Sequence, residues 1–504
     1  MKKSLLAIVL MPLMVLAAAP DRVPIKDAGE FLTKNVVTKK LKNGITVIML
    51  NHGYAPVLAF EISFRVGSVD ETYRTMGAAH LLEHMLFKGT DTIGTKDWKK
   101  ERAIQARIEA VGETIDRLEL ESPGNARLPA LRDELKRLQR EQGALVENSP
   151  YDAVYTENGG VGFNASTSRD KTGYYIQLPA SKLELWAKME SERLMNLVLR
   201  EFYLERNNVL QERLMNYDSI GTGLLFETFM ATAFIAHPYR HPIIGWRSGI
   251  PYLSIGDIRR FFREHYVPSR MTITVVGMQD TDRTLEVIAR YFERIEPRPS
   301  PPPVTVAEPA QNGERRFTLD FAASPYLIMG WHKPTYPSRD DYACDVISEI
   351  LAGGKSSRLY RALVVEKKIA TSVSAWSSAP GSRYDNLFAI FAAPRPPHTT
   401  EELERAIYEE MDRFFTDVSG DEIRKVINGI ESGMVFDLES NTGIARLLSY
   451  YQTVFGDWRY AAEYLSRIKK VTVGDIREMK DRYFTRKNRT VGILKDSRPA
   501  GGAR

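Results

Sequence analysis

Two histidines and a glutamate stand together in the segment His80-Leu81-Leu82-Glu83-His84. On a helix, residues four apart lie on one face, so His80 and His84 could give two imidazole nitrogens to one metal ion. Glu83 lies on nearly the same face and could reach a water bound to that ion. Two histidines and one carboxylate, with a fourth position open for water, are ligands typical of catalytic zinc. The segment therefore predicts a zinc hydrolase in which Glu83 takes a proton from the water.

The same helix carries Leu81, Leu82, Met85, Leu86 and Phe87. This apolar content indicates that much of the helix is buried, and buried histidines and glutamates need partners. The alternative is a pair of surface histidines beside an acid, because a pattern of five residues is short. The apolar surroundings favour metal binding.

A third ligand is needed, and Glu212 is the candidate. Glu205 and Glu212 are seven residues apart, which is about two helical turns, so they share one stripe with Val209 between them. An apolar residue flanked by two acids indicates a face turned inward towards a cation. A solvated acidic face is the alternative, and without the histidines Glu184, Glu190 and Glu201 would be equally good choices.

The elements that position these residues follow from the hydrophobic pattern. Runs rich in strand-forming residues predict strands before and after the histidine helix. We expect strands at residues 42–50 and 57–66, a helix at 76–87, two strands within 161–178 joined by a polar turn near Arg169 and Asp170, helices through about residue 217, and a strand at 271–277.

A proline-rich stretch divides the chain, and a second mixed region follows it. There we expect strands near 315–332 and 385–393 and helices near 340–367 and 400–417. Because strands, helices and strands follow in the same order in both halves, we predict an α+β fold of two related domains, each a mainly antiparallel sheet with helices packed on it. The predicted boundaries are 20–296 for the first domain, 297–314 for the linker and 315–504 for the second domain.

Residues 98–147 differ in character from their surroundings. Apolar residues recur at heptad spacing in two stretches, and Ser122-Pro123-Gly124-Asn125 separates them. We predict an inserted helical hairpin there. It is either a plain protrusion or an arm that docks a partner.

The N-terminus has the features of a signal peptide. Lys2 and Lys3 precede an apolar run at residues 5–16, and three alanines follow at 17–19. We therefore predict a signal peptide at residues 1–19 and a periplasmic or secreted protein. The run is short for a membrane anchor, so no stable anchor is expected after cleavage.

Charge and cysteine content exclude some functions. The formal net charge of the 504 residues is +5, and no long basic block occurs, so nucleic acid is not an expected partner. Cys344 is the one cysteine of the chain, which excludes an internal disulfide. Its apolar helical context predicts a buried, inert thiol. His237 and His241 are also four apart, but Pro238 and Pro242 argue against a helix and a second metal site.

The motifs resemble those of a known family. The run from His80 to Thr90 is similar to the inverted zinc motif of the pitrilysin family, to which insulin-degrading enzyme and the mitochondrial processing peptidase belong. The resemblance continues through Asn164-Ala165-Ser166-Thr167-Ser168, through Glu205 to Glu212 and His237-Pro238-Tyr239, and through Gly353 to Tyr360. It covers nearly the whole mature chain.

The resemblance implies a role for each matched residue. His80, His84 and Glu212 resemble the three ligands of one zinc ion per chain, and Glu83 resembles the general base. Glu205 resembles the family's second glutamate, which supports the ligands. Asn164 and Ala165 resemble the strand edge along which the backbone of a peptide substrate pairs. The family's fold implies two related α+β domains facing each other across a chamber.

The sequence departs from the family pattern in two places. The interval between His84 and Glu212 is unusually long, and the excess coincides with the hairpin at 98–147. Active single-chain members also carry an Arg and a Tyr, seven residues apart, that stabilise the transition-state oxyanion. Val364 and Thr371 occupy those positions here.

Neither Val364 nor Thr371 can supply the missing groups, so we expect the catalytic member of a homo- or hetero-dimer. A related partner chain would then supply the Arg and Tyr. Substitution by Arg358, Tyr360 or Arg361 is the simpler alternative, although Arg358 fits a structural role better.

Three functions are compatible with these residues. A zinc metalloendopeptidase acting on peptides or small unfolded polypeptides is the first. A non-catalytic peptide-binding or scaffolding subunit of the same fold is the second, and the presence of Glu83 with all three ligands argues against it. A zinc hydrolase of non-peptide substrates is the third, and the strand edge at Asn164 argues against that one.

Overall fold

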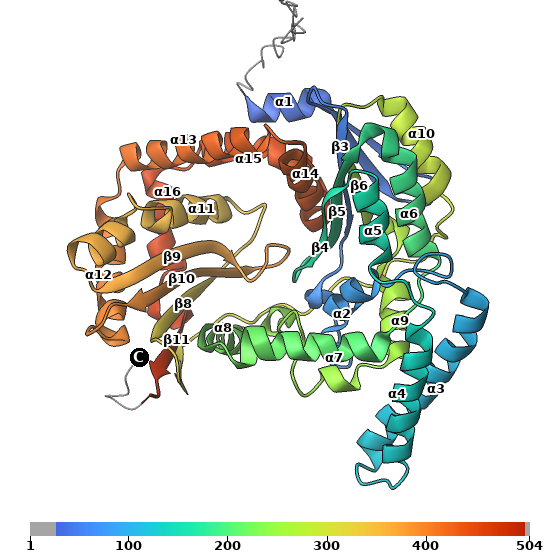
Figure 1. Cartoon of the computed structure of the whole chain (residues 1–504). Helices are drawn as coiled ribbons and strands as arrows, with labels where there is room; N and C mark the ends of the chain where they lie inside the picture. Colours follow the sequence, from blue (N-terminus) through green and yellow to red (C-terminus); the bar gives the residue numbers. More distant parts are fainter. Residues whose placement is uncertain (1–26, 499–504) are drawn as a thin grey trace, which may run out of the picture.

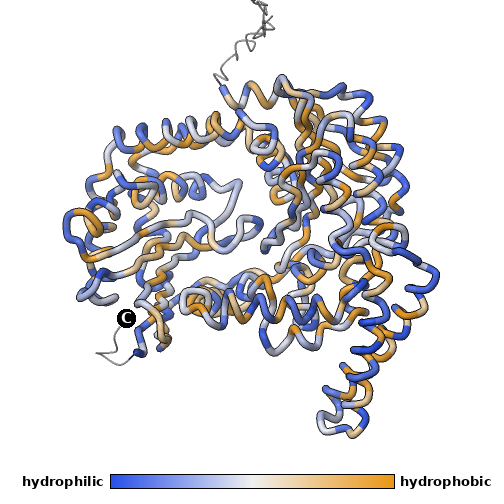
Figure 2. Tube along the Cα trace, viewed as in Figure 1, coloured by the Kyte–Doolittle hydropathy of each residue, from blue (hydrophilic) through white to orange (hydrophobic). Residues whose placement is uncertain are grey.

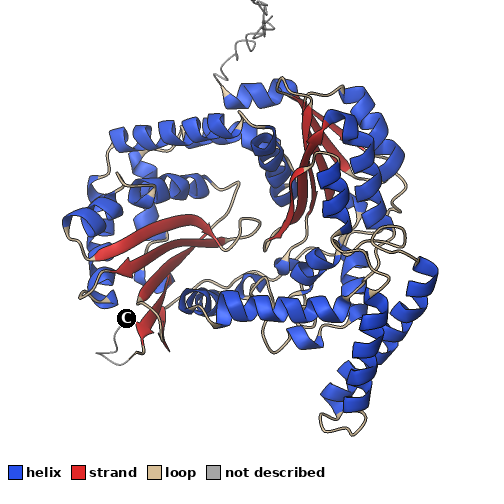
Figure 3. Cartoon of the chain, viewed as in Figure 1, coloured by secondary structure: helices blue, strands red, loops and turns tan. Residues whose placement is uncertain are grey.

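A computed structural model describes residues 27–498, and two β-sheets organise them (Figure 1). The predicted signal peptide at 1–19 lies outside the described residues. Helices cover both sheets (Figure 3). Within residues 27–498, no helix has the length and apolar character that crossing a membrane requires.

The first half contains a six-stranded sheet of order β1-β2-β6-β3-β5-β4. Its strands are β1 (Val36–Lys40), β2 (Thr46–Asn51), β3 (Val57–Phe64), β4 (Val161–Thr167), β5 (Thr172–Pro179) and β6 (Met271–Gly277). Only β2 and β6 pair in parallel among these described strands. The helices of this half are α1 (Ala28–Asn35), α2 (Ala78–Met85), α3 (Trp98–Glu121), α4 (Leu128–Gly143), α5 (Pro150–Glu157), α6 (Leu183–Met195), α7 (Phe202–Arg213), α8 (Gly221–Ala233), α9 (Ile255–His265) and α10 (Thr281–Phe292).

The second half contains a five-stranded sheet of order β7-β11-β8-β10-β9. Its strands are β7 (Arg315–Phe321), β8 (Tyr326–Lys333), β9 (Ala370–Ala379), β10 (Asn386–Pro394) and β11 (Arg489–Asp496). Its helices are α11 (Arg339–Ala352), α12 (Thr400–Asp417), α13 (Gly420–Asp437), α14 (Asn441–Phe455), α15 (Arg459–Ile468) and α16 (Val473–Arg482), with a π-helix at Tyr360–Glu366.

The two sheets repeat one topology. In each, the last strand of the half lies between two earlier strands and pairs in parallel with the first of these two, as β6 does with β2 and β11 with β7. Strand β1 is an additional edge strand of the first sheet. The remaining pairs are antiparallel, and the β4 and β9 edges correspond. The predicted α+β fold with two mainly antiparallel sheets is confirmed.

The central strands β2, β3 and β6 of the first sheet are buried on both faces because their residues alternate between two cores. Val47 and Met49 of β2 pack with the helices of their own half. Ile48 and Leu50 belong to the other core, which is built mainly from the second half. That second core includes α14, which contacts β3 and β6. Helix α14, from the last third of the chain, therefore covers one face of the first sheet.

The predicted hairpin is present as α3 and α4, which pack against each other and project from the body (Figure 1). Hydrophilic and hydrophobic residues alternate along both helices (Figure 2). Gly112 lets α3 approach α7 closely, because a Cβ there would lie 2.0 Å from the Tyr203 ring. The helix pair is thus anchored next to the helix that carries Glu205 and Glu212.

Polar side chains join the two halves at the turn after β4. Asp170 accepts hydrogen bonds from the Tyr239 hydroxyl at 2.6 Å and from the Ser382 amide at 2.6 Å. Asp70 pairs with Arg270 at 3.0 Å and with Arg383 at 2.9 Å. Since Asp70 and both arginines are largely buried, these contacts fix the second half against the strand turn near the candidate site.

Candidate metal centre

Helix α2 presents His80, Glu83 and His84 from a firmly anchored position. Leu81, Leu82 and Met85 are fully buried, which fixes the opposite side of the helix in the first core. The helix starts after Gly77, whose φ of 92° suits glycine. The Glu71 carboxylate accepts hydrogen bonds from the Gly77 and Ala79 amides, each at 2.9 Å, and so satisfies free donors of the first turn.

Helix α7 presents both glutamates of the predicted stripe. Val209, between them, is fully buried, and Phe202 and Tyr203 anchor the start of the helix. The α2 and α7 helices pack against each other. The side chain of Glu205 is 10% exposed, whereas that of Glu212 is 36% exposed, so Glu212 is the more solvent-accessible of the two carboxylates.

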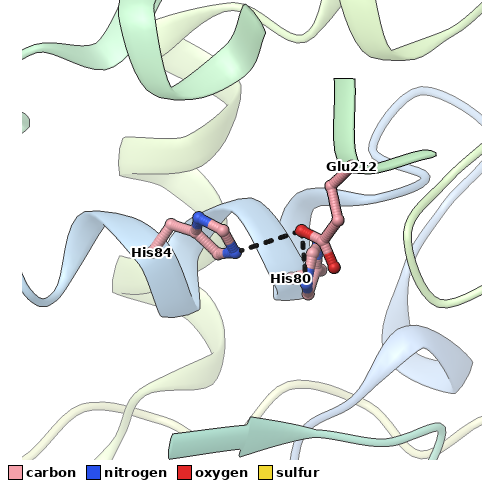
Figure 4. Close-up of side chains that lie close together, drawn as sticks. All are labelled: His80, His84 and Glu212. Atoms are coloured by element: carbon pink, nitrogen blue, oxygen red, sulfur yellow. Dashed lines mark ion pairs between the residues drawn. The ribbon is translucent and has the colours of Figure 1, made fainter. Parts of the chain in front are cut away.

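The structure brings His80, His84 and Glu212 together (Figure 4). Glu212 Oε2 lies 3.7 Å from His80 Nε2 and 3.6 Å from His84 Nε2. One possible ligand atom from each residue lies within 4.8 Å of the other two. Both separations exceed hydrogen-bond length but lie within ion-pair distance (dashed lines in Figure 4), so the three groups converge on a shared point without hydrogen bonds between them.

The donor set and spacing fit zinc. Metal–ligand bonds of about 2.0–2.2 Å in a tetrahedron place neighbouring ligand atoms roughly 3.3–3.5 Å apart. The separations from Glu212 to the two imidazoles are only slightly longer. Burial, with a smaller contribution from His84, lowers the pKa of His80 to about 3, which keeps that imidazole in the neutral form that binds metal.

Glu205 orients His84. The Nδ1–H of His84 donates to Glu205 Oε2 at 3.3 Å, which leaves the Nε2 lone pair for the side facing Glu212. Burial alone would lower the pKa of His84, but the hydrogen bond and charge of Glu205, together with Glu212 and Glu83, raise it above its ordinary value. Glu205 is therefore placed to orient His84 rather than to bind the metal itself.

Lys88 and Asn208 hold Glu205 in turn. Lys88 Nζ lies 2.6 Å from Glu205 Oε1 and 3.0 Å from Glu201 Oε2, and Asn208 Nδ2 donates to Glu205 Oε1 at 3.0 Å. Burial would raise the pKa of Glu205, but His84 and Lys88 lower it to about 2. Sequence reasoning missed these two supports, although Lys88 stands four residues after His84 in the same run.

Glu83 lies between the metal ligands and the end of β4. Burial raises its pKa above the ordinary value, while hydrogen bonding to Thr167 and the charge of His84 oppose that change. A carboxylate with a raised pKa accepts a proton more readily near neutral pH, which suits a general base. Thr167 as its neighbour was not predicted.

The other candidate third ligands are engaged elsewhere. Glu184 binds Arg290 and Tyr291, Glu190 binds Tyr155 and Arg193, and Glu201 binds Lys88. In the described part of the chain, the cluster of His80, His84 and Glu212 is the one group arranged to share a metal ion. Of the four glutamates, Glu212 is the one that this cluster places beside both histidines.

The structure also bears on two other predictions, the absence of a shared helical face for His237 and His241 and the burial of Cys344. Pro238–Arg240 forms a short 3-10 helix, so His237 and His241 do not share an α-helical face. Cys344 is fully buried, and burial raises the pKa of its thiol to about 12. The prediction of a buried thiol is confirmed.

Strand β4, which carries Asn164 and Ala165, is the outer strand of the first sheet. Asn164 is exposed and Ala165 is buried, so the two side chains point to opposite faces. Their outer backbone edge has no partner strand in the described residues. This strand also packs on α2, so a free strand edge runs up to the candidate metal centre.

Two family models match this chain. One, described as insulinase (peptidase family M16), matches residues 46–117, and the other, described as peptidase M16 inactive domain, matches residues 252–430. The chain belongs to peptidase family M16, the pitrilysin family. The first M16 match contains the whole of α2, and the second contains the Val364 and Thr371 positions.

Individual proteins of this family resemble the chain over most of its length. The zinc protease PqqE of Helicobacter pylori is 26% identical over 464 residues, which cover 90% of this chain and 91% of that protein. The crystal structure of a protease from Helicobacter pylori superposes with a TM-score of 0.77 at 24% identity, covering 91% and 99% of the two chains. The periplasmic protease PqqL of Escherichia coli superposes with a TM-score of 0.68 at 15% identity, covering 93% of this chain but 49% of that one.

The positions aligned with the missing Arg and Tyr lie in the second half, in the π-helix Tyr360–Glu366 and in β9. Val364 packs against the second core, and Thr371 is exposed at the start of β9. Arg358 binds Glu422 at 2.7 Å and also pairs with Asp417, which is a structural role. Within one chain, these residues do not join the metal centre.

Proposed function

We propose that this chain is a zinc metallopeptidase that hydrolyses peptide bonds at the centre formed by His80, His84 and Glu212. The observation that carries the proposal is the convergence of two imidazoles and one carboxylate beside a separate carboxylate, Glu83, that is not one of the three. A bound zinc ion would supply a Lewis acid and lower the pKa of a water.

The residues of the chain then have distinct tasks. Glu83 takes a proton from the attacking water and can pass it to the departing amine. Glu205 holds His84 in the tautomer that offers Nε2. The free edge of β4 at Asn164 and Ala165 pairs with the backbone of an extended peptide and positions its carbonyl next to Glu83.

An unpaired strand edge favours a peptide over other substrates. Main-chain hydrogen bonds along such an edge recognise an extended backbone without requiring particular side chains. A scaffolding subunit would need neither Glu83 nor a complete ligand set. The presence of all four side chains in one cluster therefore favours hydrolysis over binding alone.

We extend the proposal to a pair of chains. Val364 and Thr371 cannot donate to an oxyanion as Arg and Tyr can, and the loss of one such donor typically costs about two to three powers of ten in rate. A related partner chain would bring the missing Arg and Tyr to the open side of the metal centre. A second copy of this chain carries the same Val364 and Thr371, so it would have to supply other donors. The twofold length of Escherichia coli PqqL relative to this match is consistent with two such halves acting together.

We also propose export to the periplasm or the outside of the cell, which rests on the N-terminal sequence at residues 1–19. A fusion of these residues to a reporter that is active only outside the cytoplasm tests this. Activity of the fusion is expected, and retention of an uncleaved, inactive fusion would contradict it.

The test of function compares hydrolysis of a mixed peptide library by wild type and Glu83→Gln, with zinc content measured in both. We expect wild type to lose activity when a chelator removes the metal and to regain it with zinc. Glu83→Gln should keep about one zinc per chain and lose at least roughly a hundredfold in rate, as for other general bases. Undiminished activity of the zinc-loaded variant would refute the proposal.

Mixing the chain with its partner tests the pairing, because equal rates of hydrolysis with and without the partner would exclude it.

A further inference from the structure

A small hollow lies beside β4, where the two halves of the chain meet. It has a volume of about 90 Å³, and its walls include Val161 and Gly162 of β4, Tyr175 of β5 and Arg446 of α14. Arg446 is exposed, and its guanidinium carbon lies 4.9 Å from the centre of the Tyr175 ring. Helix α14 packs on β3 and β6, and its Arg446 extends from there over β5. A cation from the second half thus reaches the substrate-binding edge of the first.

The charge of Arg446 is not neutralised. Over residues 27–498, which the structure describes, Arg446 has no carboxylate within ion-pair distance. The hollow also contains Glu61, but that side chain is 2% exposed and binds Lys171 Nζ at 2.7 Å. Because Glu61 and Lys171 compensate each other, Arg446 leaves the hollow with a net positive charge.

The strand register relates Arg446 to the metal centre. Asn164 pairs directly with Tyr175 across β4 and β5, so both side chains lie on the Arg446 face of the sheet. Thr167, the neighbour of Glu83, is three residues further along β4, a distance of about 10 Å. A peptide paired with the free edge would lie about 4.8 Å beyond β4 and would point every second side chain to the Arg446 face.

We infer that Arg446 forms a carboxylate-binding subsite, which selects peptides carrying Asp or Glu about three residues from the bond that is cut. This rests on the proposed function, because it requires a peptide along β4. The Tyr175 ring holds the guanidinium in place, and a planar guanidinium binds a carboxylate through two parallel hydrogen bonds. A Lys side chain at the same peptide position is repelled.

The experiment measures binding, so it does not depend on turnover. Fluorescein-labelled decapeptides that differ by Glu, Gln or Lys at one position, moved along the peptide, are titrated with zinc-loaded Glu83→Gln protein and followed by anisotropy. At one position, Glu is expected to bind about tenfold more tightly than Lys, as for a charge-assisted hydrogen bond. Adding Arg446→Gln should abolish this preference, and adding Arg446→Glu should reverse it.

Arg405→Glu, added to the same background, is the matched control. Arg405 is exposed on α12, so this variant makes the same charge change away from β4 and should keep the preference for Glu. Persistence of the preference in Arg446→Glu, absence of a charge preference at every position, or absence of saturable binding would each overturn the inference. Hydrolysis that does not require Glu83, combined with an intact charge preference, would instead contradict the proposed function alone.

Discussion

Replacement of Glu205 by Gln should weaken zinc binding without removing a ligand. The carboxylate of Glu205 lies 3.3 Å from His84 Nδ1 and 2.6 Å from Lys88 Nζ. Its pKa of about 2, against an ordinary value of 4.5, corresponds to about 3 kcal/mol in favour of the charged form. The Gln amide keeps a hydrogen-bond acceptor for His84 but loses the negative charge. Only part of this roughly 3 kcal/mol is therefore expected as a loss of zinc-binding free energy.

We therefore expect the zinc dissociation constant of Glu205→Gln to rise by roughly 10- to 100-fold, which is usual for groups that orient a metal-binding histidine. Competition with a chromophoric chelator at fixed pH measures it. Glu201→Gln is the matched control, because Glu201 also binds Lys88, at 3.0 Å, but makes no contact with His84. An unchanged dissociation constant in Glu205→Gln, or an equal change in both variants, would refute the role assigned to Glu205.

Three further predictions concern stability and reactivity. Gly112→Ala should destabilise the fold by about 1–3 kcal/mol in urea unfolding, because its Cβ meets the Tyr203 ring, whereas Gly429→Ala, with nothing within 4 Å, should stabilise it by about 0.5–1 kcal/mol. Asp70→Ala should cost about 3–5 kcal/mol in the same assay, because it leaves two largely buried arginines unpaired, and a cost below 1 kcal/mol would contradict that. Cys344 should not react with a thiol reagent at pH 8 until the protein unfolds, and rapid reaction of the native protein would contradict its burial.

The local part of the site could be predicted from the sequence because helical spacing alone brings His80 and His84 together. The hairpin was equally predictable, since heptad spacing and a Pro-Gly break specify two packed helices. The stripe of Glu205, Val209 and Glu212 made Glu212 a candidate, and the family resemblance implied its role as a ligand, but its distance from His84 along the chain says nothing about proximity in space. The packing of α7 on α2 supplies that information.

The remaining features depend on contacts between distant segments. The pairing of Lys88 with Glu205, the position of Thr167 beside Glu83, and the contact of Asp170 with the loop at Ser382 each join residues that the sequence separates widely. Val47 and Ile48 likewise belong to different cores, and the core of Ile48 includes residues of α14. The sequence around these two strand residues gives no sign that α14 covers one face of the first sheet. Hydrophobic patterning identifies such strands as buried but does not identify what covers each face.

The location of the metal tests the central claim most directly. A crystal of the zinc-loaded Glu83→Gln protein, measured on both sides of the zinc absorption edge, gives an anomalous difference map that marks zinc alone. We predict one peak per chain, bounded by Nε2 of His80, Nε2 of His84 and the carboxylate of Glu212. A peak at another site, or none in a protein that binds one zinc in solution, would contradict the account.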